Sequence, residues 1–137
     1  MTIEEIEKEI IEEFEMFGDD WEAKYEHLID LGKSLPLIKE EFKTDDRIIK
    51  GCQSRVWLNS ELKEGIVYFT ADADAIITKG MVALMVRVLS EHTPKEIVDA
   101  KLNFVDTIGL KEHLSPTRAN GLVSMINKMK ADALSFS

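Results

Sequence analysis

Cysteine, metal-site spacings, phosphate loops and long apolar runs are scarce or missing in this sequence. Cys52 is the only cysteine among 137 residues, so no intramolecular disulfide can form. A structural zinc site takes about four ligands, which one cysteine cannot supply. The three histidines, His27, His92 and His113, stand in no paired or Cys/His spacing and in no nucleophile motif. Since there is also no glycine-rich phosphate loop, we expect neither a metal nor a cofactor.

The sequence carries no signal for a membrane span or for secretion. No apolar run approaches the ~20 residues that a membrane helix needs. The chain opens with Glu4, Glu5, Glu7 and Glu9, whereas a secretory signal begins with basic residues. We expect a cytoplasmic protein without membrane association, in a reducing compartment that keeps a single thiol free.

The net charge of -9 is concentrated near the N-terminus. Residues 1–26 contain 11 acidic residues against Lys8 and Lys24, and the remainder of the chain is balanced. This pattern argues against nucleic acid as a partner, because phosphate binding requires clustered cations. It is typical of a solvated helix face; the alternative is a docking surface for a basic partner.

The N-terminal region predicts two helices. Thr2 and Glu5 form a capping box in front of a run with apolar residues at helical spacing. The tripeptide 18–20 should end this first helix. We expect Asp19 to cap a second helix and Gly32 to terminate it.

The middle of the chain changes to strand-like sequence. Residues 56–58 and 66–70 are rich in β-branched and aromatic side chains. Residues 63–65 suit a hairpin connection between them. Ile48 and Ile49 could supply a further strand, which would place the tetrapeptide 51–54 in a turn between two strands.

The C-terminal half predicts helices again. Residues 75–89 are apolar nearly all round, as in a buried central helix. Thr93 begins a capping box with proline at the first helical position, and Ser115 precedes another proline at the start of a long helix. The order predicts an α+β fold with one domain over residues 1–137, in which helices flank a small antiparallel sheet of about three strands.

Cys52 is either an inert buried residue or a reactive thiol. Buried cysteines commonly act as small hydrophobes. Gly51, however, indicates a turning backbone, and the polar residues Gln53 and Ser54 are unusual neighbours for a core position. The cations Arg47, Lys50 and Arg55 lie close in sequence and could favour the thiolate, although two aspartates before them partly oppose this.

Two further segments place charged residues at predicted helix starts. Asp72 and Asp74 lie where the second strand leads into the central helix, and capping alone would explain Asp74. Arg118 lies early in the last helix, where a cation opposes the helix dipole. We therefore expect a carboxylate or a loop carbonyl as its partner.

Together these residues resemble a known family. The octapeptide Gly51-Cys52-Gln53-Ser54-Arg55-Val56-Trp57-Leu58 is similar to the signature of the SufE/CsdE sulfur-acceptor proteins. Four more segments fall in the family's order and spacing, and with the octapeptide they span essentially the whole chain: 21–25, 31–32 with 35–36, 72–75 and 114–122. One departure is Ala73, where the family usually has a serine; both flanking aspartates remain.

The resemblance implies a specific activity. Such a protein docks on a pyridoxal-phosphate cysteine desulfurase, and its cysteine takes the sulfane sulfur from the enzyme's persulfide. It then passes the sulfur to an iron–sulfur cluster scaffold, and it speeds the desulfurase by removing its product. On this basis Cys52 is the acceptor, and no stand-alone enzyme is expected. Residues that shape the cysteine loop are Gly51, Gln53, Ser54 and Arg55.

The resemblance also assigns supporting roles and leaves alternatives. Asp72, Asp74 and Arg118 would hold the loop region or contact the desulfurase. The protein would be a monomer or a weak homodimer. The rival hypotheses are a single-cysteine redox sensor or peroxidase-like protein, and a binding module in which the acidic first helix does the work and Cys52 is incidental.

Overall fold

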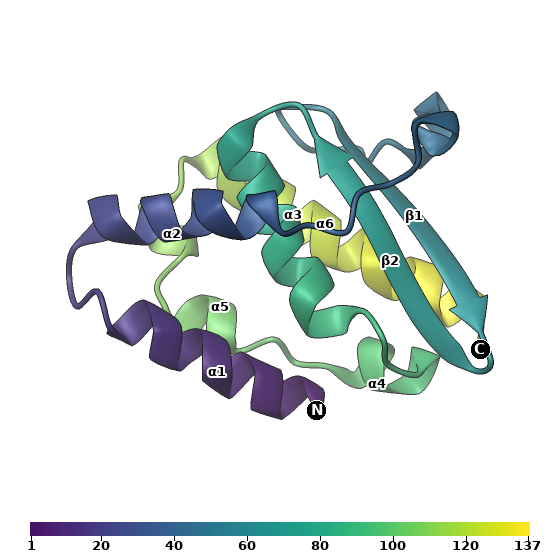
Figure 1. Cartoon of the computed structure of the whole chain (residues 1–137), viewed down its shortest axis with the longest axis horizontal. Coiled ribbons are helices and arrows are strands. Elements are labelled where there is room, and N and C mark those ends of the chain that lie inside the picture. Colours follow the sequence, from purple (N-terminus) through teal and green to yellow (C-terminus); the bar gives the residue numbers. More distant parts are fainter.

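The computed structural model describes residues 1–137 and combines α-helices with an antiparallel pair of strands, which is the predicted α+β class (Figure 1). Its helices and strands, in chain order, are α1 (Ile3–Glu15), α2 (Trp21–Lys33), β1 (Val56–Lys63), β2 (Ile66–Ala73), α3 (Ile76–Leu89), α4 (Pro94–Asp99), α5 (Phe104–Thr107) and α6 (Pro116–Ser135). Three short 3₁₀ turns complete it: η1 (Glu40–Phe42), η2 (Asp45–Arg47) and η3 (Lys111–His113). No helix combines the length and the apolar character that a bilayer crossing would require.

The two strands form one antiparallel hairpin, as predicted. Their register runs from Val56 opposite Ala73 to Lys63 opposite Ile66. Glu64 and Gly65 connect them with φ angles of 51° and 80°. Positive φ at both central residues is the geometry of a type I′ turn, whose twist matches that of the strands it joins.

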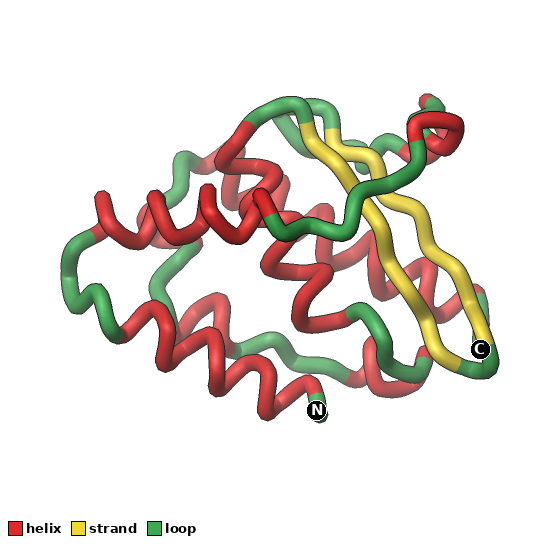
Figure 2. The backbone as a smooth tube through the Cα atoms, in the orientation of Figure 1, coloured by secondary structure: helices red, strands yellow, loops and turns green.

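The sheet has two strands, not about three. Ile48 makes only an isolated bridge with Trp57, so the predicted strand at Ile48 and Ile49 is wrong. The physical reason is local: η2 ends at Arg47, and Gly51 turns the chain with a φ of 94°. The segment between them is too short to continue a ladder (Figure 2).

Helix α3 is the centre of the core. Ten of its 14 residues are buried, which confirms the predicted central helix. In Figure 1, α2 crosses in front of α3 and α6 lies behind it. Helix α3 also packs on β2, and α6 contacts β1, so the hairpin and α6 are held against the same helix.

Gly32 does not end α2 but lies inside it, and this corrects the predicted C-cap. The reason is the close crossing of α2 with α3. A Cβ atom on Gly32 would lie 3.1 Å from the Gly80 nitrogen, and one on Gly80 would lie 2.2 Å from the Leu28 carbonyl oxygen. Two glycines therefore let the two backbones approach.

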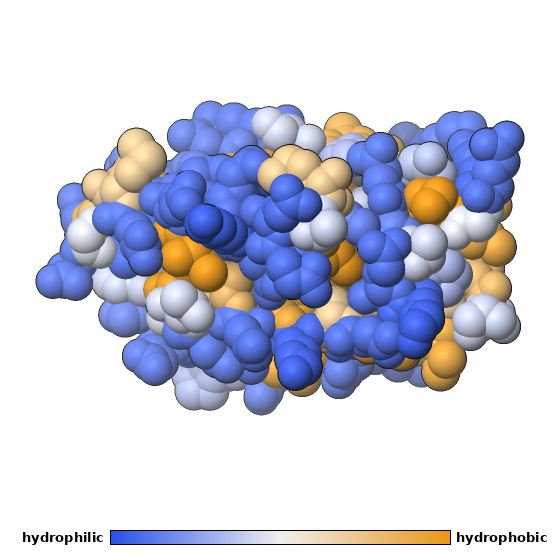
Figure 3. All heavy atoms as spheres, turned by 90° about the horizontal axis from the view of Figure 1, so that it is seen from below, coloured by the Kyte–Doolittle hydropathy of each residue, from blue (hydrophilic) through white to orange (hydrophobic).

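The first helix presents glutamates to solvent and apolar residues to the core. Its predicted capping box is present, with the Thr2 hydroxyl accepting from the Glu5 amide at 3.1 Å. The face that α1 and α4 form is mainly hydrophilic, with small separate apolar areas (Figure 3). The cap of α2 is Asp20, which accepts from the Ala23 amide at 3.1 Å, so the expectation for Asp19 is wrong.

The glycine crossing gives a stability prediction. The substitution Gly80→Ala should destabilise the fold by at least about 2 kcal/mol, because a methyl group would overlap backbone that cannot move without separating α2 from α3. Gly121→Ala is the matched control: it is also helical, but its Cβ would meet no atom closer than 3.6 Å. Urea unfolding of both variants tests this, and equal midpoints would refute it.

Candidate functional site: the Cys52 loop

Cys52 lies on a loop that is fixed at both ends. At the first end, the Ile49 amide donates to the Val56 carbonyl at 2.8 Å. At the other end, Arg55 and Asp74 are joined by two bonds: the Arg55 amide donates to Asp74 Oδ1 at 2.9 Å, and the Asp74 amide donates to the Arg55 carbonyl at 3.1 Å. Residues 50–54 between these anchors make no backbone–backbone hydrogen bond. The segment can therefore change conformation without breaking a ladder.

The loop enters β1 at the open end of the hairpin, opposite the Glu64–Gly65 turn (Figure 1). It is therefore not a turn between two strands. The prediction of a turning glycine is confirmed, since Gly51 has a φ of 94°. A Cβ atom there would also lie 2.4 Å from Ser124 Oγ, so both the backbone angle and the contact with α6 favour glycine.

The Cys52 side chain rests against α6. Its thiol is half-buried and donates to the Gly121 carbonyl oxygen at an S···O distance of 3.6 Å. Burial raises the pKa of the Cys52 thiol, because a charged sulfur is poorly solvated there. In the resting loop the sulfur is therefore a neutral thiol at neutral pH.

The expected effect of nearby cations on the thiol is absent in this conformation. Burial is the only cause of the shift in the Cys52 pKa. Arg47 is engaged elsewhere, donating to Asn59 Oδ1 at 3.1 Å and to Thr44 Oγ1 at 2.9 Å. Lys50 and Arg55 are exposed and form no ion pair. Proximity in sequence did not predict proximity to the sulfur.

The other loop residues separate into outward and inward side chains. Gln53 and Arg55 are exposed, so they are available to a partner. The hydroxyl of Ser54 is buried and has no hydrogen-bond partner. A buried hydroxyl without a partner costs free energy, and outward movement of the loop would relieve that cost.

Asp74 anchors the loop and does not cap α3. The N-cap position is Ala75, and no side chain caps this helix. The Asp74 carboxylate instead accepts from the Arg55 amide, because the strand pairing brings the two residues together at the open end of the hairpin. The capping interpretation is wrong, and the residue lies where the family resemblance implied a loop support.

Asp72 lies on β2 and does not reach the cysteine loop. It pairs with Lys43 at 2.7 Å and with Lys79 at 3.4 Å. Burial acts to raise the pKa of Asp72. Hydrogen bonds from Lys43 and the Ala73 amide, together with the charges of both lysines, act in the opposite direction and prevail, so the pKa is lowered. Asp72 therefore fastens the segment before the loop, since Lys43 also lies over the Trp57 ring at 5.3 Å.

Arg118 lies in the first turn of α6, three residues before Gly121. Its backbone amide donates to the Ser115 cap at 3.3 Å. The guanidinium has neither a carboxylate nor a carbonyl partner within the chain, so Arg118 does not hold the loop, and its contact with the desulfurase stays a prediction.

Sequence reasoning missed the residues of α6 that form the floor under the loop. Gly121 lies beside Cys52, and Ser124 lies beside Gly51. A glycine inside a helical pattern, away from its end, was the available signal, since such a glycine often marks a close approach. The start of α6 is itself fixed by α2: Trp21 stacks on His113 at 3.8 Å, and the Tyr25 hydroxyl donates to the His113 carbonyl.

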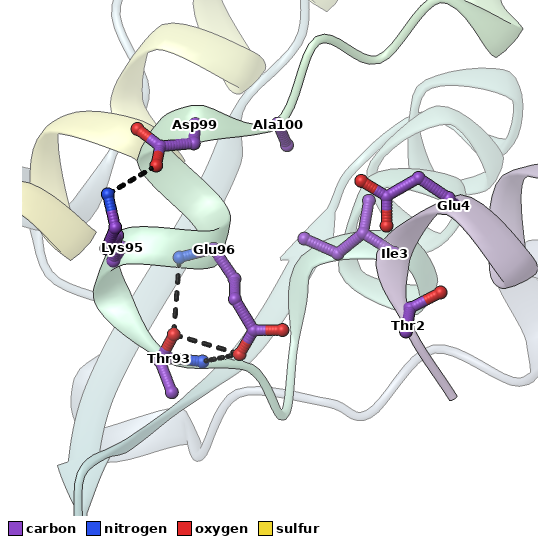
Figure 4. A pocket seen from close by; sticks show the side chains of 8 residues that line it. All are labelled: Thr2, Ile3, Glu4, Thr93, Lys95, Glu96, Asp99 and Ala100. Atoms are coloured by element: carbon purple, nitrogen blue, oxygen red, sulfur yellow. Dashed lines mark hydrogen bonds and ion pairs between the residues drawn. The ribbon is translucent and has the colours of Figure 1, made fainter.

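Two concave regions of the surface differ in their distance from the cysteine loop. A cavity of about 280 Å³ between α1 and α4 is drawn in Figure 4. There Glu96 and Thr93 satisfy each other in a capping box, and Lys95 pairs with Asp99. A groove of about 290 Å³ borders the cysteine loop instead, with Lys50, Ser124 and Lys128 among its lining residues.

The sequence matches the SufE family, described as an Fe–S metabolism associated domain, over residues 8–133. The chain belongs to this family. It is 40% identical to an uncharacterised SufE-like protein of Rhizobium meliloti (strain 1021), over 91% of this chain and 92% of that protein. It is 36% identical to an uncharacterised SufE-like protein of Synechocystis, over 93% and 79%.

A solved structure shares the fold. The solution structure of a hypothetical protein from Thermus thermophilus superposes with a TM-score of 0.78, at 18% identity, over 95% of this chain and 94% of that one. Membership of the SufE family supports a role in iron–sulfur metabolism as a sulfur-transfer protein that interacts with a cysteine desulfurase.

The raised pKa of Cys52 predicts the pH dependence of its reactivity. Alkylation by iodoacetamide should follow an apparent pKa above the ~8.5 of an ordinary thiol, because the folded loop disfavours the thiolate. The rate of modification, measured by mass spectrometry from pH 6 to pH 10, tests this. Protein unfolded in urea is the control and should return the ordinary value; a lower pKa in the folded protein would contradict the burial argument.

Proposed function

We propose that Cys52 receives sulfane sulfur from a cysteine desulfurase and carries it as a persulfide. The observation that carries the proposal is the placement of the only cysteine on a segment without backbone hydrogen bonds, anchored at Ile49 and Arg55. A carrier thiol must enter another protein's active site, and a short tethered loop meets that need. Family membership supplies the iron–sulfur context.

The transfer step balances without an external oxidant. The Cys52 thiolate attacks the terminal sulfur of the donor persulfide, forming a new S–S bond on Cys52. The original S–S bond of the donor breaks, and the donor cysteine leaves as a thiolate with the electron pair. The sulfane sulfur keeps its oxidation state, and the proton of the Cys52 thiol goes to solvent or to a base of the donor.

The resting loop must open before this step. A half-buried neutral thiol is a poor nucleophile, because the thiolate is the reactive form. Outward movement would hydrate the sulfur and return its pKa towards the ordinary range. Lys50 and Arg55 form no internal ion pair, so both cations remain available to stabilise the anion once the loop is open.

The lone cysteine also protects the cargo. A second thiol near a persulfide could attack it, releasing sulfide and forming a disulfide. In this chain no second thiol exists, so the loaded sulfur can be removed only by another molecule. We extend the proposal to transfer onto an iron–sulfur cluster scaffold, to stimulation of the desulfurase by product removal, and to action in the cytoplasm as a monomer or weak homodimer.

The redox-sensor alternative is less well supported. Peroxide-reactive cysteines are low-pKa thiols that are accessible to solvent. Burial shifts the pKa of Cys52 in the opposite direction.

The substitution Cys52→Ser tests the acceptor role. It should abolish sulfur transfer and desulfurase stimulation, because a hydroxyl cannot form the persulfide. The measurement is sulfide production by a cysteine desulfurase with free cysteine, together with mass spectrometry for one reducible added sulfur on the carrier. Ser54→Ala is the control for loop packing and should still accept sulfur. Full stimulation by the serine variant would disprove the proposal.

The anchor at Asp74 predicts a change in loop opening. Asp74→Ala removes the acceptor of the Arg55 amide, so the alkylation rate of Cys52 should rise about fivefold, the effect of ~1 kcal/mol on an open-to-closed ratio. Asp72→Ala is the matched control, since Asp72 binds Lys43 and Lys79 and not the loop. Equal rates in the two variants would show that Asp74 does not restrain the loop.

A further inference from the structure

Gly121 faces the sulfur from the second turn of α6. A Cβ atom built on it would have three nearest neighbours, all of them atoms of Cys52: Sγ at 3.6 Å, Cα at 3.7 Å and Cβ at 3.8 Å. The missing side chain therefore leaves a space about the size of a methyl group directly beside the sulfur. Gly121 itself is buried.

The unloaded protein does not need a glycine at this position. Distances of 3.6 to 3.8 Å are ordinary van der Waals contacts, so alanine would fit beside the free thiol. Alanine would also favour the helix by about 0.5–1 kcal/mol. The other helical glycines differ: at Gly80 and Gly32 an added Cβ would crowd backbone atoms at 2.2 Å and 3.1 Å.

We infer that Gly121 keeps room for the sulfane sulfur, so that the loop can return to α6 while Cys52 carries its cargo. This inference rests on the proposed function. A persulfide places its second sulfur about 2.05 Å from Sγ. Directed towards α6, this atom would occupy most of the 3.6 Å between Sγ and the position of a Gly121 Cβ. Gly121 is thus a positioning residue for the loaded state.

Retraction of the loaded loop would shield the persulfide. Sulfide is released when a thiolate or another nucleophile reaches the S–S bond, so the release rate depends on access. A side chain at Gly121 would exclude the added sulfur and hold the loaded loop outward, while leaving the unloaded loop in place. The loaded and unloaded states therefore respond differently to one methyl group.

The experiment compares wild-type protein with Gly121→Ala and with Ser124→Ala. Each is loaded with inorganic polysulfide, from which the Cys52 thiolate takes one sulfur atom and leaves a polysulfide dianion one atom shorter. The readout is the rate of sulfide release by dithiothreitol after loading, divided by the rate of iodoacetamide alkylation before loading. This ratio cancels any general loosening of the loop.

For Gly121→Ala the ratio should rise at least about fivefold over the wild type, which corresponds to ~1 kcal/mol in the open-to-closed ratio of the loaded loop. Ser124→Ala should keep the wild-type ratio, because Ser124 contacts Gly51 and not the sulfur. A wild-type ratio in Gly121→Ala, or an equal rise in Ser124→Ala, would overturn the inference.

A second measurement needs no variant. In the wild-type protein, dithiothreitol should release sulfide from loaded Cys52 at least about fivefold more slowly in the folded state than after unfolding in urea, because the returned loop limits access to the S–S bond. Equal release rates in the two states would show that the loaded loop does not return, and would also overturn the inference. Because polysulfide loading uses no desulfurase, failure of transfer from that enzyme would count against the proposed function alone.

Discussion

The position of Cys52 depends on the pairing of β1 with β2. This register ends with Val56 opposite Ala73, which brings Arg55 to Asp74 at the open end of the hairpin and fixes one end of the cysteine loop. A shift of one residue would turn the buried side of β1 towards solvent. The core face of the hairpin, packed on α3 and α6, thus holds the loop in place.

Helix α6 provides the other constraint, a floor made of small residues. Its first turn is located by the contacts of Trp21 and Tyr25 with His113. In the next two turns Gly121 and Ser124 meet the loop. Contacts far apart in sequence thus converge on a single sulfur. The family's segments at 21–25 and 114–122 lie together for this reason.

Local signals predicted much of the fold, and long-range contacts account for what they missed. The capping box at Thr2, the Glu64–Gly65 connection and the buried helix α3 depend on neighbouring residues, and each was predicted. The role of Asp74 as a loop anchor depends on strand pairing, and the role of Gly32 depends on the crossing of α2 with α3. Local sequence therefore predicted a helix cap at each of them, and both predictions were wrong. The prediction that nearby cations favour the Cys52 thiolate was wrong, because burial of the thiol determines its pKa, and closeness in sequence does not.

The raised pKa of Cys52 couples ionisation to movement of the loop. The closed loop disfavours the thiolate, whereas solvent favours it. Loss of the thiol proton must therefore shift the loop towards the open state, and the free energy of this shift equals the free energy that corresponds to the fall in pKa on opening. The thiol is therefore least reactive while it rests on α6. Under the proposed transfer, a donor site that stabilises the thiolate would draw the loop outward and activate the nucleophile in the same step. Protection in transit and reactivity on docking would then both follow from one burial equilibrium.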